Sequence, residues 1–466
     1  MRRREVVNER QRVPTPLIPR RLPSGRGAME QPNATGDGEA ALTPVFWLAV
    51  ALTGVAAGLV AAGLMWLLFT TQHLAFHYHS GDLQSAAQRA SGQRRMASLL
   101  LAGAFGGVAW YLLRRHTPGE RSEIDDALWS GDATLSARRS VGTSVISEIV
   151  IGMGASIGRE AAPKLLGGYA GSALAHLVHL SPAQRRLLVA CGAGAGFAAV
   201  YNVPVGGALF TAEVLLGSMA LPAVLPALAC SAIATAVAWL YLPNQATYVG
   251  IPNFHLSATL MVWSLVAAPV IGLFAAAFIR LIGWVSHHSA KGRWVLVAPL
   301  VAFGLLGLIG LRYPQLFGNG KDMAHSVFLG QGTLTLLLAL FALKPLVTAL
   351  CLGSGASGGL FTPALSTGAL LAGFLGLAWS HLWPGAPLGA FAMIGAAAMI
   401  GAAMQAPLAG LVLIAELTHS GFPLVVPMVA CTVIATAVTR HVDGYSIYSA
   451  RLPARRPEEP LREATN

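Results

Sequence analysis

The stretch Gly152-Met153-Gly154-Ala155-Ser156-Ile157-Gly158-Arg159-Glu160-Ala161-Ala162-Pro163 places charge between two apolar segments that are long enough to be buried in a bilayer. A carboxylate at membrane depth costs about 2.5–3.5 kcal/mol on insertion scales, so Glu160 is expected to face a cavity, a partner or a helix terminus. The neighbouring glycine and proline favour a broken helix with a new N-terminus here. Its unpaired N–H groups could bind Glu160 or a small anion. The alternative is that Glu160 merely pairs with Arg159.

The composition predicts an all-α polytopic membrane protein. The chain has 466 residues, of which 55% are hydrophobic and 11% are charged, whereas a soluble domain carries about 25% charged residues. No Asp, Glu, Lys or Arg lies between Glu213 and Arg280 or between Lys344 and Glu416. Such stretches are typical of helices that span a bilayer. The 52 glycines and 27 prolines indicate helices that pack closely and are often interrupted.

The formal net charge of +11 is best explained by basic residues at cytoplasmic ends of a membrane protein, and not by a nucleic-acid partner. Residues 1–42 are predicted to form a disordered basic cytoplasmic tail, because residues 1–40 hold eight arginines and five acids without an apolar core. Residues 43–450 would form the membrane domain, and 451–466 a short second cytoplasmic tail. The cysteines and histidines show no metal-binding spacing, so no metal or cofactor is expected.

Two motifs recur in the same order, which predicts an internal repeat. The segment 158–163 resembles 358–363, at an offset of 200 residues, and the segment 202–207 with Glu213 resembles 405–410 with Glu416, at an offset of 203 residues. The repeats are placed at about residues 96–242 and 295–440. Paired interrupted helices in two halves indicate a binding site at the bilayer midplane, and converging helix N-termini favour an anion.

These residues resemble the CLC family of chloride channels and chloride/proton exchangers. Gly158-Arg159-Glu160-Ala161-Ala162-Pro163 resembles the GREGP motif of that family, Gly359-Leu360-Phe361-Thr362-Pro363 resembles GxFxP, and a tyrosine, Tyr448, lies near the end of the chain. The resemblance implies a homodimer in which each subunit has two inverted-topology repeats with broken, partly re-entrant helices and its own pore. It also implies an integral protein of the cell (inner) membrane, with both termini cytoplasmic and chloride or a similar anion as the bound substrate.

The resemblance also implies the site residues. Glu160 would be the gating glutamate, and Arg159 of the same motif would be an anion-binding residue, as would Gly119 of the first anion loop. The backbone N–H groups of Leu360 and Phe361 and the hydroxyl of Tyr448 would hold the central anion. The first anion loop of the family, usually GSGIP, falls at residues 118–122, where Gly119 stands in place of the serine. A fluoride-selective member is therefore also considered.

Val214 decides which mode of transport is expected. Family exchangers often carry an internal glutamate directly after the residue that corresponds to Glu213, and here that position is Val214. Valine cannot carry a proton, so the sequence favours passive, channel-like conduction gated by protonation of Glu160. A chloride/proton antiporter is the alternative.

An enzymatic alternative rests on Gly355-Ala356-Ser357-Gly358, which matches the GxSG loop of rhomboid-type intramembrane serine proteases. That chemistry requires a histidine base within hydrogen-bond reach of the serine. His381 and His419 lie downstream, but neither lies within a continuous apolar helix. We therefore do not expect an enzyme.

Overall fold

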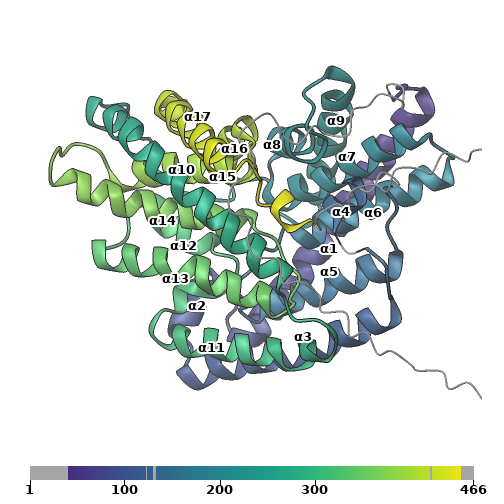
Figure 1. The fold of residues 1–466 in the computed structure, drawn as a ribbon, viewed down its shortest axis with the longest axis horizontal. Coiled ribbons are helices and arrows are strands. Elements are labelled where there is room, and N and C mark those ends of the chain that lie inside the picture. Colours follow the sequence, from purple (N-terminus) through teal and green to yellow (C-terminus); the bar gives the residue numbers. More distant parts are fainter. Residues whose placement is uncertain (1–39, 122, 130–132, 420–421, 453–466) are drawn as a thin grey trace, which may run out of the picture. The chain divides into compact units, whose positions relative to one another are not determined.

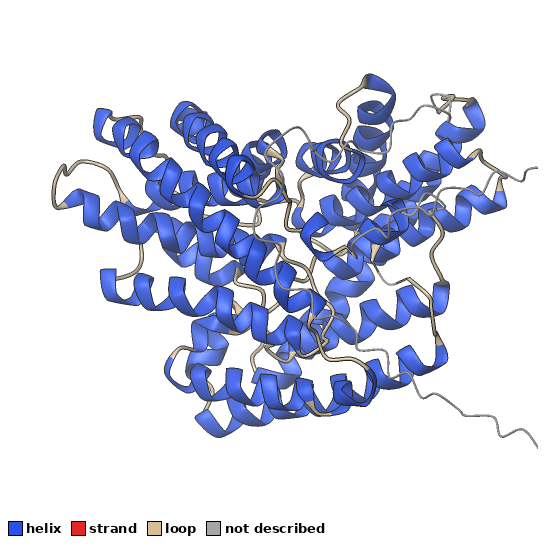
Figure 2. Ribbon diagram, in the orientation of Figure 1, coloured by secondary structure: helices blue, strands red, loops and turns tan. Residues whose placement is uncertain are grey.

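A computed structural model describes residues 40–121, 123–129, 133–419 and 422–452. Its described residues form helices joined by short loops, and no strand occurs among them (Figures 1 and 2). Most of the two predicted tails, and Ser122 in the predicted first anion loop, lie outside the described residues. The all-helical class predicted from composition is confirmed.

Among the described residues, eight helical segments are long and apolar enough to cross a membrane. They are α1 (Pro44–Phe76), α3 (Gly92–His116), α9 (Leu221–Ala238), α10 (Ala258–His287), the segment Gly292–Arg312 that contains η2 (Gly292–Leu296) and α11 (Ala298–Arg312), α13 (Leu334–Gly353), α14 (Phe361–Ser380) and α17 (Val425–Val442).

The remaining helices are shorter. They are α2 (Leu83–Arg89), α4 (Ile124–Trp129), α5 (Ala137–Gly152), α6 (Ala161–Leu177), α7 (Pro182–Tyr201), α8 (Pro204–Leu209) with the π-helix η1 (Phe210–Leu216), η3 (Pro314–Leu316), α12 (Lys321–Phe328), α15 (Leu388–Met404), α16 (Pro407–Thr418), η4 (Phe422–Leu424) and η5 (Ser449–Arg451). At 1.5 Å per residue, a 17-residue helix such as α6 reaches only about 26 Å, which is less than the hydrocarbon core of a bilayer. The predicted interrupted helices are therefore present.

The repeat is visible in the backbone. The helix that precedes the second motif ends in each half on a residue in the left-handed conformation, Asn202 with φ 57° and Gln405 with φ 56°. In each half a proline then begins a new short helix, α8 or α16. A residue with positive φ stops the first helix, and a proline at the first helical position starts the next. The same local chemistry therefore produces the same break twice.

In Figure 1, α6, α7 and α9 of the first half lie on the right, and α10, α14 and α17 of the second half lie on the left. Within each half, small residues allow close packing. A Cβ atom on Gly167 of α6 would overlap the carbonyl oxygen of Gly192 on α7, and a Cβ atom on Gly395 of α15 would overlap Ala372 of α14. Close backbone approach of this kind is how helices associate where lipid replaces water.

Reciprocal contacts join the halves. The carboxylate of Glu213 accepts hydrogen bonds from the N–H groups of Leu408 and Ala409, at 3.3 and 2.7 Å, at the start of α16. The carboxylate of Glu416 accepts from the N–H groups of Val205 and Gly206, at 3.0 and 2.6 Å, at the start of α8. Each glutamate thus satisfies the unpaired donors at a helix N-terminus of the other half.

Candidate functional site

The helix break at Glu160 is the centre of the site. Helix α5 ends at Gly152, α6 begins at Ala161, and Glu160 is the N-cap residue of α6 with only 3% of its surface exposed. Its carboxylate does not cap α6. One oxygen accepts a hydrogen bond from the N–H of Phe361 at 2.7 Å, at the start of α14. The expectation that Glu160 lies at a positive helix end holds, but the helix belongs to the other half.

Two hydroxyl groups complete the environment of this carboxylate. The Tyr201 hydroxyl donates to the second oxygen of Glu160 at 3.1 Å, the Thr362 hydroxyl lies 3.4 Å from the same oxygen, and the two hydroxyls are 2.6 Å apart. Sequence reasoning missed both residues. Tyr201 directly precedes the break at Asn202, and Thr362 lies inside the GxFxP-like motif, so both could have been suspected from their places next to a break.

Arg159 does not pair with Glu160. Its guanidinium lies 5.1 Å from the ring centre of Tyr201 and 5.9 Å from that of Phe69, which are cation–π contacts. There is no ion pair between Arg159 and Glu160. The alternative in which Glu160 is held simply by its neighbour is therefore not observed.

Adjacent residues at this helix break line two different cavities. The small cavity has a volume of about 40 Å³ and is lined by residues from both halves, among them Glu160, Leu360 and Tyr448. The large cavity has a volume of about 340 Å³ and is lined by polar residues that include Arg159. Arg159 and Glu160 are adjacent in the sequence but line different cavities, so their side chains leave the helix break in different directions.

The structure brings together part of the predicted anion site. Leu360 and Tyr448 line the small cavity, and the N–H of Phe361 points to the Glu160 carboxylate. The hydroxyl of Tyr448 has a thioether as its acceptor, the sulfur of Met404 at 3.9 Å. Sulfur is a weak acceptor, so this hydroxyl remains able to donate to an anion.

Gly119 does not join this group. It is exposed, has φ 75°, and does not line the small cavity. Of the described residues in this part of the chain, those that line the small cavity are Glu123, Ile124 and Asp125, at the start of α4. Placement by motif spacing alone therefore selected a residue several positions too early.

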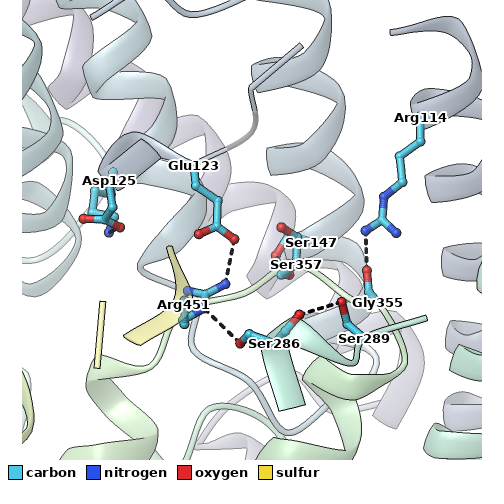
Figure 3. Close-up of polar contacts among 10 residues, drawn as sticks. Arg114, Glu123, Asp125, Ser147, Ser286, Ser289, Gly355, Ser357 and Arg451 are labelled. Carbon is cyan, nitrogen blue, oxygen red and sulfur yellow. Dashed lines mark hydrogen bonds and ion pairs between the residues drawn. The ribbon is translucent and has the colours of Figure 1, made fainter. Parts of the chain in front are cut away.

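Charged residues that the sequence reasoning passed over also line the small cavity. Lys164 forms an ion pair with Asp125 at 3.2 Å, and Arg451 forms an ion pair with Glu123 at 2.6 Å. Figure 3 shows Arg451 bonded to both Glu123 and Ser286. Lys164 could have been noticed, because it is a lysine four positions after Glu160 in an otherwise apolar helix.

Val214 lies half-buried in η1, next to Glu213, whose carboxylate is held by the N-terminus of α16. A different acid interacts with the gate. Glu148 on α5 is fully buried, and neither of its carboxylate oxygens has a hydrogen-bond partner among the described residues. It interacts electrostatically with Arg159 and Glu160. The sequence analysis did not select Glu148, although it is the one acid within residues 140–157.

The arrangement around Ser357 does not support a protease. The Ser357 carbonyl accepts a hydrogen bond from the Ser147 hydroxyl at 2.6 Å, and the two residues lie side by side in Figure 3. His381 follows the C-terminal end of α14, a 20-residue helix that places it about 30 Å from the start of that helix near Ser357. His419 is exposed beyond the end of α16. His381 is therefore too far from Ser357 to act as its base.

Comparison with known proteins identifies the family. A family model described as voltage gated chloride channel matches residues 102–440. The chain belongs to the CLC family. This confirms the resemblance drawn from the motifs, and it assigns the membrane fold described above to anion transport.

Named CLC relatives include both channels and exchangers. The chain is 29% identical over 412 residues to the voltage-gated ClC-type chloride channel ClcB of Citrobacter koseri, with 86% of this chain and 97% of the relative covered. It is 34% identical over 354 residues to a putative ClcB-like chloride channel protein of Ralstonia nicotianae, with 72% and 80% covered. It is 26% identical over 382 residues to the H(+)/Cl(-) exchange transporter ClcA of Vibrio campbellii, with 79% and 81% covered.

Solved CLC structures share the fold. A slow cyanobacterial Cl⁻/H⁺ antiporter superposes with a TM-score of 0.76 at 20% identity, covering 88% of this chain and 97% of its own. A CLC-type fluoride/proton antiporter superposes with a TM-score of 0.72 at 21% identity, covering 87% and 97%. The fold predicted from the motifs, with two inverted repeats and broken helices, is therefore that of CLC transporters.

Proposed function

We propose that this CLC protein exchanges a small inorganic anion for protons, with Glu160 as the gate. The observation that carries the proposal is the hydrogen bond from the Phe361 N–H to the carboxylate of Glu160, at 2.7 Å, since Glu160 lines the small cavity. A permeating anion needs the same donor, so it can pass only when Glu160 leaves. Protonation of Glu160 removes its negative charge and so weakens its hydrogen bond with the Phe361 N–H. Anion movement is thereby linked to a proton on Glu160.

Exchange is better supported than the passive conduction that Val214 led us to expect. The relative from Vibrio campbellii is named an H(+)/Cl(-) exchanger, and the two solved structures compared above are antiporters. A buried carboxyl group elsewhere in the chain could also carry the proton in place of an acid at position 214. Glu148 lies between Ser144 and Ile151 on one face of α5, and these two residues line the small and the large cavity respectively. The proposed proton route therefore uses Glu148 where Val214 offers no acid.

Channel-like conduction remains the second candidate, because of Val214 and because the relative from Citrobacter koseri is named a channel. Flux measurements on purified protein in liposomes distinguish the two. With a chloride gradient, no initial pH gradient and the voltage clamped by an ionophore, an exchanger moves protons uphill at a fixed ratio to chloride. A channel leaves the lumenal pH flat, and this result would contradict the proposal. Repeating the assay with fluoride tests whether this protein, with glycine at position 119, transports fluoride in preference to chloride.

The bacterial relatives support placement in the inner membrane. We further propose that both termini face the cytoplasm and that the protein is a homodimer, as the family resemblance implies. Protease protection of tags on each terminus in inverted vesicles tests the topology. Light scattering on the detergent-solubilised protein tests the dimer, and a monomeric mass would contradict it.

A further inference from the structure

Lys164 occupies an unfavourable place for a lysine. It lies in the first turn of α6, where a positive side chain opposes the helix dipole, and its side chain is only 11% exposed. A buried ammonium requires negative or polar partners. We propose that Lys164 is the side-chain cation of the anion site in the small cavity, and that Asp125 is its resting counter-ion. This inference rests on the proposed function in anion transport.

Two groups that an anion would use, the Lys164 ammonium and the Tyr448 hydroxyl, belong to residues that line the small cavity. The Lys164 ammonium lies 4.6 Å from the ring centre of Tyr448, whose hydroxyl has the Met404 thioether as its acceptor among the described residues. Lys164 also interacts electrostatically with Glu160. A volume of about 40 Å³ accommodates one small ion, since a single water needs about 10–15 Å³ by the same measure.

Asp125 holds the place of an anion when none is bound. Its carboxylate lies 3.2 Å from the Lys164 ammonium, and its side chain is 9% exposed. The second cation of the cavity, Arg451, is already engaged by Glu123 and by the Ser286 hydroxyl, as Figure 3 shows. Lys164 is therefore the charge that an anion between Tyr448 and Glu160 would meet. Asp125 would compete with an anion for the Lys164 ammonium, just as Glu160 would compete with an anion for the Phe361 N–H.

A simpler role for the pair would be to fasten α4 to α6. The two roles differ in the sign of their effects. If Lys164 binds the anion, Asp125→Asn frees the ammonium and tightens binding, while Lys164→Met weakens it. If the ion pair is purely structural, both substitutions lower thermal stability. The two variants then do not change the anion affinity in opposite directions.

The test is calorimetric titration of chloride, and separately of fluoride, into the purified full-length protein. We expect Lys164→Met to weaken binding about tenfold or more, and Asp125→Asn to tighten it by a few-fold, since hydrogen bonds to charged groups are among the stronger ones. Lys164→Arg should retain most of the affinity. Asp443→Asn is the matched control, because Asp443 pairs with Arg280 at 2.6 Å, is also 9% exposed and does not line the cavity.

The double variant Asp125→Asn/Lys164→Met avoids an unpaired buried acid and should bind as weakly as Lys164→Met. If the single variant does not fold, the double variant provides the test. Wild-type anion affinity in Lys164→Met or in the double variant would overturn the inference and leave the proposed anion transport intact. An equal loss of anion affinity in Asp125→Asn and Lys164→Met would do the same. If the wild type neither binds chloride or fluoride nor transports them in liposomes, the proposed function itself fails.

Discussion

Gly158 and Gly359 donate their N–H groups to each other's carbonyl oxygens, at 2.8 and 2.7 Å. They lie two positions before Glu160 and Phe361 respectively, so this bridge fixes the starts of α6 and α14 against each other. A Cβ atom on Gly359 would overlap the Glu160 carboxylate. The bridge therefore explains why the carboxylate of one half reaches the N–H group of the other.

Glu160→Gln is expected to raise anion flux at neutral pH and to remove most of its pH dependence. An amide is neutral at every pH, so it competes poorly with an anion for the Phe361 N–H. In the wild type, acid should raise flux, because protonation of Glu160 has the same effect as the substitution. Chloride efflux from liposomes between acidic and neutral pH measures both, with Asp443→Asn as control. Unchanged flux and pH response in Glu160→Gln would exclude Glu160 as the gate.

Tyr448→Phe is expected to weaken anion binding while leaving the fold intact. The substitution removes one donor to a charged acceptor, worth about 1.5–3 kcal/mol before water compensates. The ring contact with Phe210, with centroids 5.9 Å apart, is retained by phenylalanine. Chloride titration by calorimetry measures the change. Equal affinity in wild type, Tyr448→Phe and Tyr448→Ala would show that the hydroxyl is not a ligand.

Glu148→Gln is expected to abolish uphill proton movement while chloride still flows. Glutamine keeps the size of the side chain but cannot carry a proton, and the original carboxylate has no hydrogen bond to lose among described residues. The assay is the same liposome measurement of lumenal pH. Val214→Glu serves as comparison and should change the coupling ratio little. If Glu148→Gln pumps protons as the wild type does, the route passes elsewhere.

Glu213→Gln and Glu416→Gln are each expected to lower the midpoint of thermal unfolding by a similar amount. Each removes the charge from a carboxylate that accepts two backbone hydrogen bonds across the halves, and such bonds are worth about 1.5–3 kcal/mol each. Labelling of the four buried cysteines, Cys191, Cys230, Cys351 and Cys431, by a thiol-reactive dye during heating reports the midpoint. A loss in only one variant would show that the two contacts are not equivalent.

Local chemistry explains what the sequence could predict. The break at Glu160 follows from a glycine and a proline near a charge in an apolar run, and the second break follows from Asn202 and Gln405 before proline. These signals lie within a few residues of the feature they specify. The family motif then indicated Leu360 and Phe361, which the structure places at the start of α14.

Contacts between distant segments could not be predicted in the same way. Lys164 meets Asp125 across 39 positions, and Tyr201 meets Glu160 across 41. Which residue of the segment before α4 faces the cavity depends on how α4 packs against α6, so motif spacing placed Gly119 in the site while the structure places Asp125 there.

The reciprocal contacts of Glu213 and Glu416 restrict how this protein can operate. Alternating access by rocking one half against the other would break four charge-assisted hydrogen bonds at once, because each carboxylate holds two N–H groups of the opposite half. These hydrogen bonds therefore hold the two halves together as one rigid unit. We expect the transport cycle to be confined to side chains, with Glu160 swinging away from Phe361 while the helices that frame it stay in register.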